Sequence, residues 1–158
     1  MPSAVEVNDN IKSVKKSQFK YGTAGFRMQA SLLEEVSGRM GLFAATISQC
    51  LGEAVGLMIT ASHNPEPDNG LKLVGPDGAM APMAWEALAE SFVNASEEDL
   101  HLITNQIRDQ LSNQFRNGQG VIIVGRDTRA SGRLLLDLIK KSAPSDCKII
   151  DLGLVTTR

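Results

Sequence analysis

The sequence has little of several features that mark specialised protein classes. Two cysteines among 158 residues are too few for a disulfide scaffold, and they lie in no metal-ligand spacing. A net charge of −2 leaves no broad basic surface for a nucleic-acid backbone. The apolar runs are shorter than the roughly 20 residues that span a bilayer. We therefore expect neither a nucleic-acid nor a membrane partner.

The length favours one ordinary domain with a single core. Residues 1–18 are polar and show little periodicity, so we predict a flexible N-terminal tail over 1–18 and one domain over 19–158. The tail also lacks the apolar region of a signal peptide, and the low cysteine content suits a reducing compartment. Both observations favour a cytoplasmic location.

The order of apolar segments predicts an α/β fold. Short apolar runs at 55–61 and 121–125 are typical of strands buried on both faces, and weaker strand signals lie at 71–74 and 147–155. Helical spacing of apolar residues, with start and stop signals, predicts helices between them. We expect a layered domain with a mostly parallel, mixed sheet covered by helices. The predicted helices cover 31–51 up to Gly52, a segment whose first turn holds Pro82, the stretch from Ser96 to about Gly118, and a last helix capped by Ser131 with Leu134, Leu135, Leu138 and Ile139 on one face.

The stretch TASHNPEPDNGLK follows the first buried strand, at the end where ligands bind in open α/β sheets. Pro65 and Pro67 fix the backbone, and Asn69-Gly70 is expected to supply the reversal, so the loop would present Ser62. A serine hydroxyl needs a base or a prior modification to react, and His63 and Lys72 are the nearest candidates. The alternative is an ordinary turn, with Lys72 a solvent-facing strand residue.

A second polar loop, GRDTRASG, follows the other buried strand, and a third, YGTAGFR, precedes the first predicted helix. Arg27, Arg126 and Arg129 are forked donors suited to a phosphate dianion. The alternative is that Asp127 pairs with its neighbouring arginines, an exposed contact that contributes about 0 to 1 kcal/mol. Three polar, glycine-bearing loops in one small domain favour a single crevice that recognises phosphate.

Taken together, YGTAGFR, TASHNP followed by DNGLK, and GRDTR resemble the first domain of the α-D-phosphohexomutases. The resemblance extends over about residues 21–157. In most of that family the GRD-type motif precedes the serine motif, whereas here the serine motif comes first. This order resembles the phosphoacetylglucosamine mutase branch.

The resemblance implies a role for each motif residue. Ser62 would carry a phosphoryl group, give it to a sugar phosphate and recover the other phosphoryl group, which interconverts N-acetylglucosamine 6-phosphate and 1-phosphate for UDP-N-acetylglucosamine synthesis. Lys72 would act as general base, and His63 and Asn64 would orient the phosphoryl group. The three arginines, Arg27, Arg126 and Arg129, would bind phosphoryl oxygens or brace the loop.

The resemblance also implies cofactors whose binding sites this sequence contains only in part. One Mg²⁺ ion would be held by the Ser62 phosphoryl oxygen and three aspartates of a second domain, and a sugar bisphosphate would act as activator. Neither that aspartate loop nor the later sugar-binding domains are present, and Arg158 stands where the family usually continues with proline. We therefore expect a truncated mutase that needs the remaining domains as partners, or else a non-catalytic domain that binds a phosphosugar or a protein partner. A serine phosphohydrolase is a third reading, but the sequence supplies no metal-ligand set for it.

Overall fold

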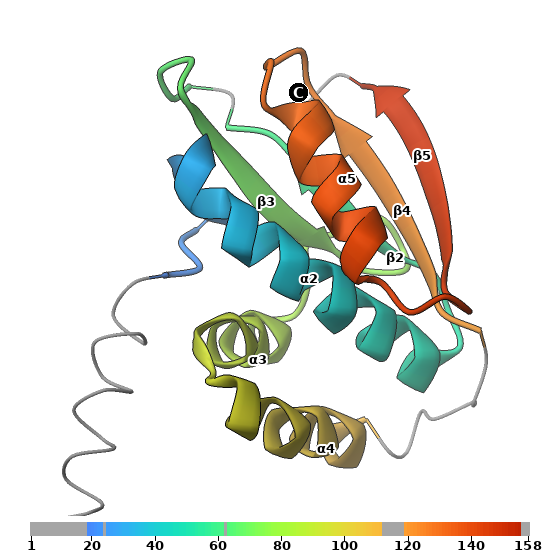
Figure 1. Ribbon diagram of the computed structural model, residues 1–158. Helices are drawn as coiled ribbons and strands as arrows, with labels where there is room; N and C mark the ends of the chain where they lie inside the picture. The colour runs from blue at the N-terminus through green and yellow to red at the C-terminus, as the bar shows by residue number, and fades with distance from the viewer. Residues whose placement is uncertain (1–18, 24, 62, 112–118, 156–158) are drawn as a thin grey trace, which may run out of the picture.

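The computed structural model describes residues 19–23, 25–61, 63–111 and 119–155, so the predicted tail over 1–18 lies outside the described residues. Strands and helices are interspersed along the chain, which confirms the predicted α/β fold class (Figure 1). In chain order the elements are β1 (Phe26–Gln29), α2 (Ala30–Leu51), β2 (Val55–Ile59), β3 (Asp68–Val74), α3 (Met83–Asn94), the 3₁₀ helix η1 (Glu97–Asp99), α4 (Leu100–Gln110), β4 (Val121–Arg126), α5 (Gly132–Ser142) and β5 (Lys148–Leu154).

The strands form one mixed sheet in the order β1-β3-β2-β4-β5. β3 runs antiparallel to both β1 and β2, whereas β4 runs parallel to both β2 and β5. A short loop joins β2 to β3 and allows the antiparallel pairing, while β4 and β5 are each reached through helices, as parallel strands require. The mixed sheet is confirmed, with parallel pairing confined to the half that holds β4 and β5.

Helices α2 and α5 lie side by side across one face of the sheet, and α3 and α4 pack against α2 (Figure 1). α2 is therefore enclosed, and its buried side chains include Leu33, Met40 and Phe43. It ends where predicted, because Gly52 adopts the left-handed φ of 69° that closes a helix. No helix in the described ranges is long and apolar enough to cross a membrane.

The face of the sheet away from α2 is only half-buried. Along β2 the burial alternates, with Leu57 and Ile59 buried beneath the helices and Met58 half-buried on the other side. The prediction that this strand is buried on both faces is thus wrong for one face. Among the described helices none covers the second face, so its side chains keep partial contact with solvent.

Three helices start at or within one residue of the predicted position, but they differ in their caps. Ser96 accepts a hydrogen bond at Oγ from the backbone amide of Asp99 at 3.3 Å. Pro82 lies one residue before α3 rather than in its first turn. Ser131 precedes α5, but its side chain makes no cap bond and instead accepts from Asn69. The predicted extension of α4 to Gly118 runs beyond Gln110 into residues 112–118, which lie outside the described ranges.

The predicted apolar face of α5 is wrong at one position. Leu134 is 49% exposed, and Leu136 takes its place among the fully buried side chains. Leu135 and Ile139 are buried as predicted. The stripe of leucines was ambiguous because consecutive leucines fit two faces of a helix equally well.

Candidate functional site

The connection from β2 to β3 carries the serine motif and is held by its own backbone. Ser62 itself lies outside the described residues. On either side of it, the amide of Asn64 donates to the carbonyl of Ala61 at 2.7 Å, and the amide of Asp68 donates to the carbonyl of Pro65 at 3.0 Å. Ala61 and residues 63–68, here called the serine loop, are therefore held by two successive short-range backbone hydrogen bonds of the kind found in tight turns, as the prolines predict.

The prediction that Asn69-Gly70 reverses the chain is wrong, because both residues lie within β3 and pair with Met28 and Arg27 of β1. Asn69 is fully buried, and its Nδ2 donates to Ser131 Oγ at 2.9 Å. A Cβ on Gly70 would collide with the carbonyl oxygen of Thr60 and lie 2.9 Å from that of Phe26. Close approach of three backbone segments, not a turn, explains this glycine.

The GRDTR loop contacts the end of β2 and the serine loop that follows it, as its position after the neighbouring parallel strand predicts. Asp127 Oδ2 accepts a hydrogen bond from Thr60 Oγ1 at 2.8 Å, and the Asp127 amide donates to the carbonyl of Ile59 at 3.1 Å. Asp127 also pairs with Arg129, since its Oδ2 lies 3.6 Å from Arg129 Nε and its Oδ1 accepts from the Arg129 amide at 3.1 Å. The arginine pairing weighed as an alternative is present, but it forms part of the contact between the two loops.

Arg129 makes the most extensive contact with the serine loop. Its Nη2 donates to the carbonyls of Ala61 and Asn64, both at 2.7 Å. Its Nη1 donates to the carbonyls of Pro65, at 2.7 Å, and Asp68, at 3.1 Å. The side chain is only 10% exposed. Because a guanidinium has four Nη–H donors, these four carbonyls engage all of them.

Arg27 and Lys72 share the face of the sheet that the helices leave open. Arg27 pairs with Gly70, Lys72 follows two residues later on β3, and residues two apart on a strand share a face. Arg27 lies directly against β3, because the Cγ of Arg27 is 3.1 Å from the position that a Cβ on Gly70 would take. Arg27 is exposed and Lys72 half-buried, and neither forms an ion pair with another described residue.

The third arginine, Arg126, lies apart from this pair. It has the same strand phase as the buried Ile122 and Val124, and its side chain packs over Gly132 at the start of α5. Its Nε is buried and has no hydrogen-bond partner in the described structure. The three arginines predicted to bind phosphate therefore occupy three different environments.

The remaining motif residues, His63 and Asn64, lie on the serine loop and differ in exposure and in hydrogen bonding. His63 is exposed, whereas Asn64 is half-buried and its Nδ2 donates to Asp68 Oδ2 at 3.1 Å. The interactions of Asn69 with Ser131 and of Arg129 with four carbonyls were not predicted. They join residues more than 60 positions apart, and no local pattern in the sequence indicates them.

Within the described ranges, no group of three or more His, Cys, Asp or Glu side chains could hold a metal ion. Two carboxylates at the serine loop, those of Asp68 and Asp127, are engaged in hydrogen bonds. The described residues thus do not fit a Mg²⁺ ligand set by themselves.

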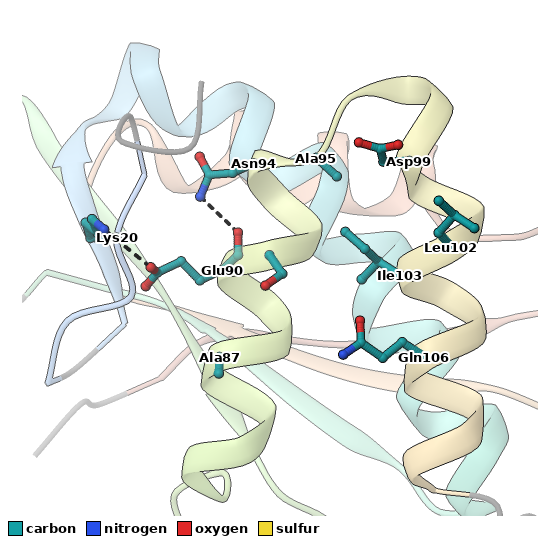
Figure 2. Close-up of a pocket in the computed structure, with 10 residues that line it drawn as sticks. Lys20, Ala87, Glu90, Asn94, Ala95, Asp99, Leu102, Ile103 and Gln106 are labelled. Carbon is teal, nitrogen blue, oxygen red and sulfur yellow. Dashed lines mark hydrogen bonds and ion pairs between the residues drawn. The ribbon is translucent and has the colours of Figure 1, made fainter. Parts of the chain in front are cut away.

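A cavity of about 770 Å³ lies on another part of the molecule, against α3 and α4 (Figure 2). Figure 2 shows Lys20 directed toward Glu90, with 3.6 Å between Nζ and Oε1, and Gln106 and Ile103 projecting from α4. None of its lining residues comes from the three motif loops. It is therefore separate from the candidate site.

Comparison with known proteins gives a consistent result. Residues 40–100 match the family model described as "Phosphoglucomutase/phosphomannomutase, alpha/beta/alpha domain I". The chain is 40% identical to human phosphoacetylglucosamine mutase over 139 residues, which is 87% of this chain and 26% of the human protein. It is 37% identical to the probable phosphoacetylglucosamine mutase of Encephalitozoon cuniculi over 162 residues, or 99% of this chain and 30% of the relative.

Solved structures agree with the sequence relatives. The N-acetylphosphoglucosamine mutase of Aspergillus fumigatus in complex with glucose 1,6-bisphosphate superposes with a TM-score of 0.79 at 33% identity, over 92% of this chain and 29% of that one. The complex of the same enzyme with GlcNAc-6P and magnesium gives a TM-score of 0.76 at 39% identity, over 87% and 26%.

The chain spans between a quarter and a third of the length of these relatives. Over that span the chain is similar to the first domain of the phosphoacetylglucosamine mutases, which belong to the α-D-phosphohexomutase superfamily.

Proposed function

We propose that this chain supplies the phosphoserine of a phosphoacetylglucosamine mutase. In this proposal Ser62 carries a phosphoryl group and exchanges it with an amino-sugar phosphate, so that N-acetylglucosamine 6-phosphate and 1-phosphate interconvert. The proposal rests on the serine motif and on the relatives with that name, of which one was solved with GlcNAc-6P.

The chemistry is a double phosphoryl transfer. The bond between Ser62 Oγ and phosphorus breaks, and a bond forms between phosphorus and the free hydroxyl oxygen of the sugar phosphate. The proton of that hydroxyl passes to a base, for which we propose the Lys72 amine, and the protonated Lys72 then gives this proton to Ser62 Oγ. The resulting bisphosphate reorients and returns its other phosphoryl group to Ser62 by the reverse steps.

The observation that carries the proposal is that two basic side chains beside the serine loop form no ion pair with a described residue. Arg27 and Lys72 lie on one face of neighbouring strands, and neither is neutralised by a described carboxylate. The Arg27 guanidinium, whose charge is not already offset, attracts a phosphoryl dianion, and Lys72 adds a second positive charge once it has accepted the proton of the sugar hydroxyl. Arg126, with its unpartnered Nε, is a further candidate at the start of α5. His63 and Asn64 are proposed to orient the phosphoryl group.

The proposed cofactors extend beyond the described residues. Mg²⁺ would offset charge on the phosphoryl oxygens when bound, but apart from the Ser62 phosphoryl oxygen its ligands would come from outside this chain. A sugar bisphosphate is proposed as activator, because a relative was solved with glucose 1,6-bisphosphate. We place the reaction in the cytoplasm, where two free cysteines would stay reduced.

The first test is phosphorylation of the chain itself. Purified protein is incubated with glucose 1,6-bisphosphate and Mg²⁺, and intact mass spectrometry measures the phosphoryl group on wild type and on Ser62→Ala. The proposal expects uptake by wild type alone, and uptake that persists in Ser62→Ala would refute it. Conversion of N-acetylglucosamine 6-phosphate is then assayed with and without the remaining domains of a relative added in trans.

A second candidate function is binding without turnover. Leu152 and Leu154 on the edge strand β5 are 56% and 59% exposed, which suits contact with another protein surface. In this alternative the chain binds a phosphosugar or a protein partner but transfers no phosphoryl group. Absence of phosphorylation and of conversion, both alone and with added domains, would favour it.

A further inference from the structure

Arg129 is conspicuous because its contacts leave it no donor for a substrate. We propose that Arg129 is a positioning residue that holds the serine loop in its reactive shape and does not itself bind the phosphoryl group. This inference rests on the proposed function, since the shape of the loop matters because Ser62 lies within it.

The contacts of Arg129 account for the whole guanidinium. Its four Nη–H donors reach four carbonyls spread over residues 61–68, and its Nε faces Asp127. Hydrogen bonds from a charged donor are roughly twice as strong as neutral ones. A phosphoryl oxygen could bind Arg129 only if one of these bonds were broken first.

The Arg129 side chain is also held in place by Asp127. Asp127 orients Arg129 through Nε and through the backbone amide, and Asp127 is itself held by Thr60 and by the carbonyl of Ile59. Arg129 therefore connects the serine loop to the ends of β2 and β4. The loop takes its shape from these two strands rather than from its own turns alone.

The direction of the carbonyls has an electrostatic consequence. Carbonyl oxygens are the negative ends of the peptide dipoles, and a phosphoserine carries roughly −1.5 to −2 charges. Carbonyls turned toward Arg129 are held in one direction, whereas released carbonyls could face the phosphoryl group and repel it. Arg129 would thus favour the phosphorylated loop through the carbonyls it binds.

This role depends on the fork of the guanidinium and not on its charge. Lysine keeps the positive charge but presents its three donors from a single nitrogen, which cannot reach four separate carbonyls. Arg129→Lys therefore distinguishes a role of the guanidinium geometry from a role of the positive charge. Arg27→Gln is the matched control, because it removes an arginine near the serine loop that makes no hydrogen bond to the described residues of that loop.

The first measurement is amide hydrogen exchange on the full chain. The amides of Asn64 and Asp68 donate within the serine loop and report its opening, whereas the buried strand residues Leu57 and Val124 report global unfolding. We expect Arg129→Lys to speed exchange at Asn64 and Asp68 at least about tenfold, since several hydrogen bonds are lost. Arg27→Gln should leave both rates unchanged.

The second measurement is titration with inorganic phosphate, followed by amide chemical shifts. Arg129→Lys should change the dissociation constant by less than about twofold, because the charge is kept and no phosphate contact is lost, and because free phosphate, unlike a phosphoryl group on Ser62, is not held against the released carbonyls. Arg27→Gln should weaken binding by more than Arg129→Lys does. Wild-type exchange at Asn64 and Asp68 in Arg129→Lys, or a larger loss of phosphate affinity than in Arg27→Gln, would overturn the inference.

If Arg129→Lys does not fold, Asp127→Asn decides the question. It retains Arg129 but removes the carboxylate beside Nε, so exchange should quicken at Asn64 and Asp68 while Leu57 and Val124 stay protected. Unchanged amide exchange at Asn64 and Asp68 in that variant would refute the positioning role of Arg129.

Phosphorylation of Ser62 is measured separately from amide exchange and phosphate titration. If wild type accepts a phosphoryl group, Arg129→Lys should accept it at least about tenfold more slowly, on the same hydrogen-bond estimate, despite near-normal phosphate affinity. Equal rates would count against positioning. If wild type accepts none, the proposed function fails for this chain, and the exchange rates still decide whether Arg129 holds the loop.

Discussion

Gly70 offers a sharp test of how tightly the site is packed, because no side chain fits there. The Cβ of an alanine would collide with the carbonyl oxygen of Thr60 and lie 2.9 Å from that of Phe26. Both atoms belong to backbone that is fixed by pairing, since the Thr60 amide donates to the Gly70 carbonyl and Phe26 pairs with Leu71. Neither carbonyl can rotate away as the tip of a side chain could.

The cost of Gly70→Ala can be estimated from these contacts. Overpacking of a close-packed site costs about 1 to 3 kcal/mol, and contact with two backbone atoms places this site near the upper value. Alanine regains up to about 1 kcal/mol by restricting the unfolded chain. The net loss is about 2 kcal/mol, which for a chain of this length lowers the melting temperature by about 4 to 8 °C.

Gly38→Ala is the matched control, because a Cβ at Gly38 would meet nothing within 4 Å. Gly38 lies within helix α2, where alanine is favoured over glycine by roughly 0.5 to 1 kcal/mol. Thermal and urea unfolding, followed by circular dichroism, should show the melting temperature rising for Gly38→Ala and falling for Gly70→Ala. If Gly70→Ala is as stable as wild type, the close approach of the three backbone segments is wrong.

Three further predictions concern other parts of the molecule. The pKa of Tyr21 is raised, chiefly by burial, so the free energy of unfolding should hold below about pH 10 and fall above it; Tyr21→Phe should remove that part of the fall in urea titrations across this range. Tyr21→Phe should also cost about 1 kcal/mol at neutral pH, because the Leu73 amide loses its acceptor. Burial raises the pKa of both cysteine thiols, but Cys50 is 1% exposed and Cys147 only half-buried, so a thiol reagent at pH 8 should label Cys147 first; equal rates would contradict the packing around Cys50. Ser96→Ala should lower the free energy of unfolding by about 1 kcal/mol through loss of the cap before α4, and an unchanged urea midpoint would show that the Ser96 cap contributes nothing.

Much of the fold could be predicted because its signals are local. The apolar spacing of α2 and the glycine after it specified that helix to within a residue, since Gly52 alone accepts the left-handed conformation that ends it. The errors arose where two local patterns competed. Asn69-Gly70 is the usual signature of a turn, but burial of the Asn69 amide and the backbone approach at Gly70 place both residues in a strand.

The site was predictable in outline and not in its contacts. Loops after adjacent parallel strands emerge at the same edge of a sheet, which is why the serine loop and the GRDTR loop could be expected to meet. Which atoms meet depends on the register of β2 and β4, on the path of the serine loop and on the rotamer of Arg129. A single sequence does not determine these, so Arg129 could be proposed as a phosphate ligand or as a brace with equal justification.

The strand register nevertheless explains why Thr60 and Asp127 find each other. Ile59 pairs with Arg126, so Thr60 and Asp127 are the next residues along two parallel strands. The Asp127 amide continues the ladder by donating to the carbonyl of Ile59, and the hydrogen bond from Thr60 Oγ1 extends it through the side chains. A slip of one residue would turn Asp127 to the opposite face of the sheet. The buried side chains that fix this register, Leu57 and Ile59 on β2 and Ile122 and Val124 on β4, therefore also fix the acceptor that holds the serine loop, although none of them belongs to a motif.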